Sequence, residues 1–330
     1  MSHHLPDFDL RLLSELQYGF PLSPEPFKAL SERLGVEETP LLRRINHHVE
    51  RGVIHKIAFL INQRATRYKE AALIGARVPA GMVGKVAEEI NSRDEVTHNY
   101  LRNHRRYNLW FTFKAETGDK LREGVESLIS RAGIDDHVLL PSKRVYKISY
   151  PKYDLKEGIS RSPPTIEPEK VPTLQELGVK KDLAHDLAAG LSVENEPFRR
   201  IAQRNDLDVH ELLSLIRELV ARGVIRDWGA VLNGSRLGFK ANAMVVLKVR
   251  PEEAEGICLD IVGVFEEVTH CVERFIVPGR WEYPAYFVVH ALGEDRIEDF
   301  LNKVRDSLSV EECLPLYGVA NLRRNRPILL

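Results

Sequence analysis

Residues 96–112 concentrate side chains that can bind anions and exchange protons. The segment holds two histidines, three arginines, two tyrosines and a tryptophan, namely His98, His104, Arg102, Arg105, Arg106, Tyr100, Tyr107 and Trp110. Arginine can bind a carboxylate through two parallel hydrogen bonds, and histidine titrates near neutral pH, so it can act as a general acid. These residue types make the segment the first candidate for the chain's chemistry.

A second segment near the C-terminus repeats the first. The triplet Val-Thr-His stands at residues 96–98 and again at 268–270, and an arginine follows each histidine by four positions. The alternation of a β-strand predicts two sets of side chains that each share one face: Val96, His98, Tyr100 and Arg102, and in the second segment His270 and Arg274. Behind the second triplet lie further cationic and aromatic candidates, Arg280, Trp281 and Tyr283.

The repeat extends over half the chain. Residues 220–225 match 49–54 at an offset of 220 − 49 = 171, and residues 268–270 match 96–98 at an offset of 268 − 96 = 172. A nearly constant register of this kind indicates a tandem duplication. The copies diverge behind the triplet, since His98 to Tyr107 spans 107 − 98 = 9 positions and His270 to Tyr283 spans 283 − 270 = 13.

Each copy has the element order of a winged helix-turn-helix followed by a ferredoxin-like βαββαβ domain, so the fold class is α+β. In the first copy, apolar spacing and glycine stops predict helices over about 9–16, 27–34 and 38–51 and a wing over 53–62. A strand over 71–78, a hairpin of two strands over 96–112 and a last strand over 138–148 then alternate with helices over 81–91 and 120–131. The expected domains are 1–62, 63–150, 182–235 and 236–330, with a Pro-rich linker at 151–181. The two βαββαβ domains are expected to face one another as a pseudo-dimer.

Composition narrows the class of protein. Hydrophobic residues make up 43% and charged residues 29% of the 330 residues, as in a globular protein. No apolar run approaches the roughly 20 residues of a membrane span, so no membrane partner is expected. The three cysteines form no Cys-x-x-Cys pair, which disfavours a disulfide framework and suits the cytoplasm. With 47 Lys and Arg against 48 Asp and Glu, the chain lacks the basic surplus of a dedicated DNA-binding protein.

The plan of both halves resembles the Lrp/AsnC family of amino-acid-responsive regulators, and residues 39–45 resemble the start of that family's recognition helix. The segment 98–111, His-Asn-Tyr-Leu-Arg-x-His followed by Tyr-Asn-Leu-Trp-Phe, resembles instead the signature of the siroheme decarboxylases, Lrp-like proteins of haem d1 synthesis and of the alternative haem pathway. In that family two related subunits, or one fused chain, remove the acetate carboxyls at C12 and C18 of siroheme. The second copy departs from the pattern, since residues 280–284 read Arg-Trp-Glu-Tyr-Pro where relatives often carry Asp-Trp-Pro-Tyr.

The resemblance implies a fused siroheme decarboxylase and a role for each candidate residue. The histidines would supply the proton donor and a ligand for the siroheme iron: His98, His104 and His270. The arginines would bind carboxylates: Arg102, Arg105, Arg106, Arg274 and Arg280. The aromatic side chains would lie against the macrocycle: Tyr100, Trp110, Trp281 and Tyr283. No cofactor is expected, because the ring and iron of the substrate provide the electron sink.

Other interpretations stay open at this stage. The repeated Val-Thr-His can preserve a hydrogen bond that shapes the hairpin, and at least one of the three arginines at 102, 105 and 106 can be a solvated surface group. A DNA-binding regulator of the Lrp/AsnC type that senses a small molecule or haem is the second hypothesis, although residues 209–218 are acidic and apolar. A tetrapyrrole carrier without turnover is the third. Siroheme is the expected partner, and a homodimer and contacts with other haem-biosynthesis proteins stay open.

Overall fold

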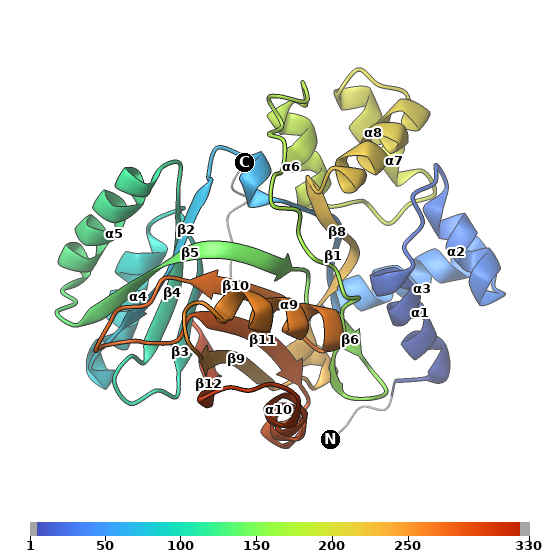
Figure 1. The fold of residues 1–330 in the computed structure, drawn as a ribbon. Helices are drawn as coiled ribbons and strands as arrows, with labels where there is room; N and C mark the ends of the chain where they lie inside the picture. The colour runs from blue at the N-terminus through green and yellow to red at the C-terminus, as the bar shows by residue number, and fades with distance from the viewer. Residues whose placement is uncertain (1–4, 324–330) are drawn as a thin grey trace.

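The computed structural model describes residues 5–323, and each half of the chain begins with three helices and a strand (Figure 1). In the first half these are α1 (Asp7–Tyr18), α2 (Pro26–Leu34), α3 (Glu38–Glu50) and β1 (Ile54–Ile61). In the second half they are α6 (Lys181–Ala189), α7 (Pro197–Arg204), α8 (Val209–Ala221) and β8 (Ile225–Leu232). A proline at the first position starts α2 and α7, and Gly35 ends α2 in the left-handed conformation with φ of 70°. The predicted helix-turn-helix order is confirmed in both halves.

The two wing strands pair with each other. β1 runs antiparallel to β8, with Phe59 opposite Trp228, and the pair forms a separate two-stranded sheet. The helices of both halves pack around this sheet in one shared hydrophobic core. The helix-turn-helix regions therefore act as a single body that joins the two copies of the repeat.

The second part of each half is a βαββαβ unit, as predicted. The first unit consists of β2 (Glu70–Ala76), α4 (Val83–Asn91), β3 (Val96–Arg102), β4 (Leu109–Ala115), α5 (Gly118–Ala132) and β5 (His137–Ile148). The second consists of β9 (Ala241–Lys248), α9 (Ala254–Val264), β10 (His270–Arg274), β11 (Ala285–Ala291), α10 (Glu294–Ser307) and β12 (Glu312–Asn321). Between residues 5 and 323, no helix combines the length and the apolar character that crossing a bilayer requires.

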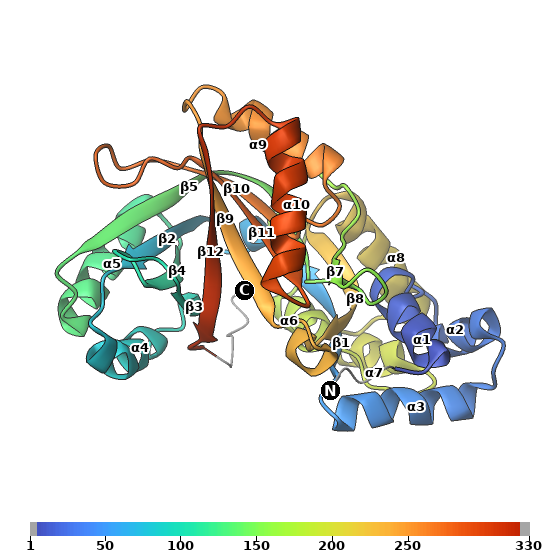
Figure 2. The ribbon, with the colours of Figure 1, turned by 90° about the horizontal axis from the view of Figure 1, so that it is seen from below.

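The strands of the two units form one closed ring instead of two facing sheets. Hydrogen bonding follows the order β10-β5-β2-β4-β3-β12-β9-β11, and β11 also pairs with β10, which closes the ring. The halves are joined where β3 meets β12 and where β5 meets β10. Figure 2 shows α4 and α5 outside the strands of the first unit and α9 and α10 outside those of the second. Alternate side chains therefore point either to a helix or to the barrel interior.

A β-bulge shifts this alternation at the start of β3. The register of β3 against β4 slips between Val96 and His98. Val96 is fully buried in the core beneath the helices of the first unit, whereas His98, Tyr100 and Arg102 line the barrel interior. The prediction that Val96 shares a face with His98 is therefore wrong, because the extra residue of a bulge interrupts the alternation of side chains along the strand.

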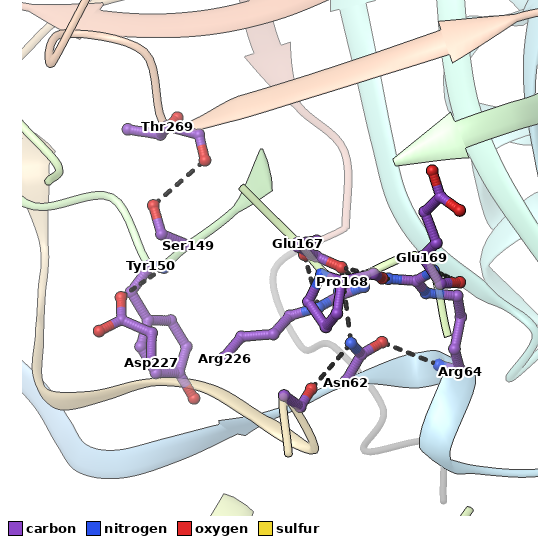
Figure 3. Close-up of polar contacts among 11 residues, drawn as sticks. Asn62, Arg64, Ser149, Tyr150, Glu167, Pro168, Glu169, Arg226, Asp227 and Thr269 are labelled. Atoms are coloured by element: carbon purple, nitrogen blue, oxygen red, sulfur yellow. Dashed lines mark hydrogen bonds and ion pairs between the residues drawn. The ribbon is translucent and has the colours of Figure 1, made fainter. Parts of the chain in front are cut away.

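The segment predicted as a linker is fastened to both parts of the molecule. Two short strands, β6 (Tyr153–Asp154) and β7 (Ile159–Ser160), extend the sheet beside β11. Further on, the buried carboxylate of Glu167 forms ion pairs with two arginines (Figure 3). Nε of Arg226 lies 2.7 Å from Oε1, and Nη2 of Arg64 lies 3.0 Å from Oε2. The backbone N–H of Glu167 donates to the carbonyl of Tyr146 on β5 over 2.8 Å. This residue thus ties both wings to the barrel.

We expect Glu167→Gln to destabilise the fold by about 3–5 kcal/mol, because it leaves the buried Arg226 without a carboxylate. Urea unfolding followed by circular dichroism measures this change. The matched control is Glu266→Gln, since Glu266 and its partner Arg161 are both exposed, with side-chain exposures of 42% and 56%. The control should change stability by less than about 1 kcal/mol. Equal effects of the two substitutions would contradict the assignment of Glu167 as the tie.

Candidate active site

The barrel contains a cavity of about 650 Å³, within the roughly 300–1,000 Å³ typical of small-molecule sites. Strands of both units line it, and the lining continues to β1, β8, the short helical turn η1 (Gln63–Ala65) and Glu169 of the linker. The cavity therefore lies between the barrel and the wings. Six of the residues singled out from the sequence belong to the lining: His98, Tyr100, Arg102, Trp110, His270 and Arg274.

The two histidines of the repeated triplet have the same kind of partner. Thr97 Oγ1 lies 3.0 Å from Nδ1 of His98, and Thr269 Oγ1 lies 3.0 Å from Nδ1 of His270. Thr112 brings a second hydroxyl to 3.4 Å from Nδ1 of His98. The hydrogen bond that the triplet suggested as an alternative explanation is therefore present. This hydrogen bond orients each imidazole within the cavity lining. The triplet can therefore both shape the hairpin and place a histidine for chemistry.

The two arginines that follow the triplets, Arg102 and Arg274, form the paired arginines of the cavity. Arg102 is buried and Arg274 half-buried, and Nε of each is shielded from solvent and has no hydrogen-bond partner among residues 5–323. Neither makes an ion pair with a carboxylate in that range. Loss of hydration lowers the pKa of each guanidinium to about 10, so both stay charged at neutral pH. A charge held in this way can be neutralised by a bound anion.

An aromatic cluster fills the barrel interior beside the cavity. Trp110 packs against Trp281 with ring centroids 5.0 Å apart, and Tyr107 lies 5.8 Å from Trp281. Gly75 makes room for the indole of Trp110, because a Cβ there would lie 2.7 Å from that ring. His104 belongs to this cluster and is absent from the lining: its ring lies 5.2 Å from Trp281, and its Nδ1 accepts the backbone N–H of Tyr107 over 3.0 Å.

The remaining residues predicted from the sequence lie outside the cavity lining. Arg106 Nε donates to Asp136 Oδ2 over 3.0 Å, and Arg280 Nη2 donates to Oδ1 of the same carboxylate over 2.6 Å. These hydrogen bonds, that of Arg106 first, lower the pKa of Asp136. Two further candidates are the exposed Arg105 and Tyr283, whose hydroxyl donates to a glutamate on β12. A direct contact of these residues with substrate stays a prediction.

Cations dominate the polar lining of the cavity. Eight lysines and arginines line it, Arg64, Lys69, Arg102, Lys114, Lys143, Arg144, Arg226 and Arg274, against two carboxylates, Glu70 and Glu169. Sequence analysis identified only the paired arginines. Lys114 could have been found, because it follows Trp110 by four positions on β4 and shares its face. Arg226 comes from the wing strand β8 and Arg64 from the turn η1 that follows β1, and no sequence pattern links them to the barrel.

Two family models match the chain, one for the βαββαβ units and one for the first helix-turn-helix region. The AsnC-like ligand binding domain matches residues 67–147 and 236–323, and the siroheme decarboxylase NirDL-like HTH domain matches residues 9–54. The siroheme decarboxylase of Hydrogenobacter thermophilus is 30% identical over 315 residues, which cover 95% of this chain and 90% of the relative. The chain belongs to the siroheme decarboxylase family.

Solved structures agree with membership of the siroheme decarboxylase family. The crystal structure of the siroheme decarboxylase NirDL matches with a TM-score of 0.67 at 26% identity. Its co-complex with an iron-uroporphyrin III analogue matches with a TM-score of 0.66 at 27% identity. Each match covers 97% of this chain and 93% of the crystallised one. The resemblance drawn from residues 98–111 is confirmed, and the chain is a decarboxylase.

The position of His104 makes stability depend on pH in this member of the siroheme decarboxylase family. Burial lowers the pKa of His104 below its ordinary value of 6.5, so the unfolded chain takes up this proton at a higher pH than the folded chain. The contribution of His104 to folding stability should therefore fall as pH drops from 6.5 through the folded pKa. His104→Asn keeps an acceptor for the Tyr107 N–H but cannot titrate.

Urea unfolding of wild type and His104→Asn at a series of pH values from neutral to mildly acidic measures this dependence. The free energy of unfolding of wild type should decline more steeply toward acid than that of the variant. Parallel curves would show that His104 titrates as in the unfolded chain.

Proposed function

We propose that this decarboxylase removes the acetate carboxyls at C12 and C18 of siroheme and yields 12,18-didecarboxysiroheme. The observation that carries the proposal is the pair of arginines, Arg102 and Arg274, whose shielded Nε atoms have no hydrogen-bond partner among the described residues. They line the same cavity as the two threonine-bound histidines. The complex of NirDL with an iron-uroporphyrin III analogue, a macrocycle edged with carboxylates, supports a tetrapyrrole as the ligand.

The paired arginines are assigned to the acetate carboxylates. A guanidinium binds a carboxylate through two parallel hydrogen bonds, and such charge-assisted bonds are about twice as strong as neutral ones. Because Arg102 and Arg274 stand in the cavity without a carboxylate of the protein, desolvation of their charges disfavours the ligand-free state. Binding of an acetate group supplies the missing counter-charge, so the substrate is held at the carboxyl groups it loses.

The remaining lining suits the rest of the macrocycle. Tyr100, Trp110 and Tyr286 offer flat apolar surfaces within the cavity. The other cations of the lining, among them Lys143, Arg144 and Arg64, can bind the carboxylates that the enzyme retains. This division follows the general pattern of cofactor-sized sites, which are apolar with a few well-placed polar groups.

His98 and His270 are assigned as general acids. In each step the bond between the acetate methylene and its carboxyl carbon breaks, CO2 leaves, and the electron pair passes into the pyrrole ring. The methylene carbon then takes one proton and becomes a methyl group. Nδ1 of each histidine is bonded to threonine, so we assign the transferred proton to Nε2. Histidine suits this step because its proton affinity lies near neutral pH.

Three further parts of the proposal concern other molecules. No cofactor of the protein's own is needed, because the iron and ring of siroheme take up the electron density. The alternative role for a histidine of the cavity, His98 or His270, is to bind the siroheme iron through Nε2, and the histidine that does so is then not the proton donor. Pairing of two chains and contacts with other haem-biosynthesis proteins stay predictions.

The first test is anaerobic incubation of the purified protein with siroheme, with the pigment's mass followed over time. Wild type should remove two molecules of CO2 in succession. His98→Ala and His270→Ala should each slow CO2 loss by about 10²–10⁴-fold, the usual contribution of a general acid. The control is His185→Ala, because His185 is exposed on α6. Full activity of both cavity variants would refute the general-acid assignment.

The second test measures binding without turnover. Arg102→Ala and Arg274→Ala should each weaken binding of iron-uroporphyrin III by about 10–100-fold, the effect of losing a hydrogen bond to a charged group. Titration followed by the pigment's absorption gives the dissociation constant. Arg199→Ala is the control, since Arg199 is exposed on α7, outside the cavity lining. If the control weakens binding as much as the cavity variants, the ligand lies elsewhere.

A further inference from the structure

The paired arginines occupy equivalent positions in the two halves and share one anchor. Arg102 and Arg274 differ by 274 − 102 = 172, the offset of the repeat before the longer hairpin loop. Nη1 of Arg102 donates to the backbone carbonyl of Leu316 over 2.6 Å, and Nη1 of Arg274 donates to that of Leu140 over 3.2 Å. These two carbonyls are also equivalent. The hairpin loop of the second copy is four residues longer, so the offset of the repeat after this loop is 176, as between Tyr107 and Tyr283, and 316 − 140 = 176. The duplication has kept this bond.

The second anchor of each arginine is different. Nη1 of Arg274 donates to Oγ of Ser142 over 3.0 Å, and Ser142 is the residue opposite it on β5. The residue opposite Arg102 on β12 is Gly318, at 318 − 142 = 176, which offers no hydroxyl. Nη1 of Arg102 reaches instead to Oδ1 of Asn242 on β9 over 3.3 Å.

The first half has no counterpart of this asparagine. The residue equivalent to Asn242 is Ala71, at 242 − 71 = 171. Asn242 is itself oriented, because its Nδ2 lies 2.9 Å from Nδ1 of His290, so the amide donates to the imidazole while its oxygen faces the arginine. The position equivalent to His290 is Lys114, at 290 − 114 = 176, and a charged ammonium cannot accept such a bond. The asparagine anchor is therefore specific to one half.

The aromatic support of the arginines differs in the same way. The guanidinium of Arg102 lies 5.1 Å from the ring of Tyr100, its neighbour on β3. That of Arg274 lies 5.3 Å from the ring of Tyr286, on the opposite strand of its hairpin. Each arginine is thus held by one carbonyl, one polar side chain and one tyrosine. The carbonyls stand at equivalent positions of the two copies, whereas the polar side chains and the tyrosines do not.

We propose that Asn242 and Ser142 are positioning residues that orient Arg102 and Arg274 respectively, and that each arginine serves one of the two decarboxylations. The inference rests on the proposed function and adds to it that the two half-sites are inequivalent. Each half-site holds one acetate, loses one CO2 and returns one proton to the methylene carbon. Loss of one positioning residue therefore impairs one of the two steps.

The test compares the products of Asn242→Ala and Ser142→Ala after anaerobic incubation with siroheme. Each variant should slow one CO2 loss by about 10-fold or more, the effect of a lost hydrogen bond to a charged group. Each should accumulate a singly decarboxylated product, and the two products should be different regioisomers, separable by chromatography and assigned by NMR. Asn302→Ala and Ser92→Ala are matched controls on exposed helix surfaces and should form the final product at the wild-type rate.

A rescue variant separates positioning from folding. In Asn242→Ala combined with Gly318→Ser, the hydroxyl takes the place that Ser142 has in the other half. The site accepts a side chain, because a Cβ on Gly318 would meet its nearest neighbour at 3.5 Å, an ordinary contact. We expect the double variant to recover at least part of the rate of the CO2 loss that Asn242→Ala slows. A structural defect caused by Asn242→Ala would not be repaired by this hydroxyl.

The outcomes are distinct. The inference is overturned if both variants accumulate the same isomer, if both steps slow equally, or if neither step changes. If wild type releases no CO2, the proposed function fails instead, and titration with iron-uroporphyrin III decides the positioning claim. Each variant should then bind about 10-fold more weakly than wild type, and unchanged affinity overturns the claim.

Discussion

Closure of the ring of strands is the constraint on which the site depends. The pairings of β3 with β12 and β5 with β10 join the open edges of two βαββαβ units. A single unit would expose these edges and would have an inner face covered by nothing. Once the ring is closed, side chains about 172 positions apart in the sequence line one cavity, as His98 and His270 do. The duplication therefore creates the cavity that is the candidate site, and neither copy contains it alone.

The polar lining costs stability that other parts of the chain provide. Arg102 and Arg274 stand in a site that lowers their pKa values, and neither has a carboxylate partner among residues 5–323. The outer faces of the strands bury large apolar cores beneath the helices, and the wings add a third core. The tie at Glu167 then holds the wings over the cavity. The outer faces of the strands thus bury the cores beneath the helices, and the inner faces carry both the aromatic cluster and the cavity.

The sequence predicts most of the fold and part of the cavity lining, and the differences between pattern and structure have physical causes. Apolar spacing and the repeat offset suffice for the βαββαβ order, and alternation places Arg102 beside His98. Alternation fails at Val96, because a bulge is invisible in residue types alone. It carries no information in the hairpin loops, and the loop residues His104 and Arg280 are absent from the cavity lining. The cations from the wings require knowledge of how the two parts of the chain pack.

Divergence between the halves follows from the shape of the proposed substrate. Siroheme has two acetates to lose but no two-fold symmetry of its own, so two identical half-sites cannot both fit it. The features that every such step needs are retained in both copies: the threonine-bound histidine and the arginine on a backbone carbonyl. The features that set the direction of each guanidinium, Asn242 in one half and Ser142 in the other, differ. A fused chain permits this, because each copy can change without altering its partner.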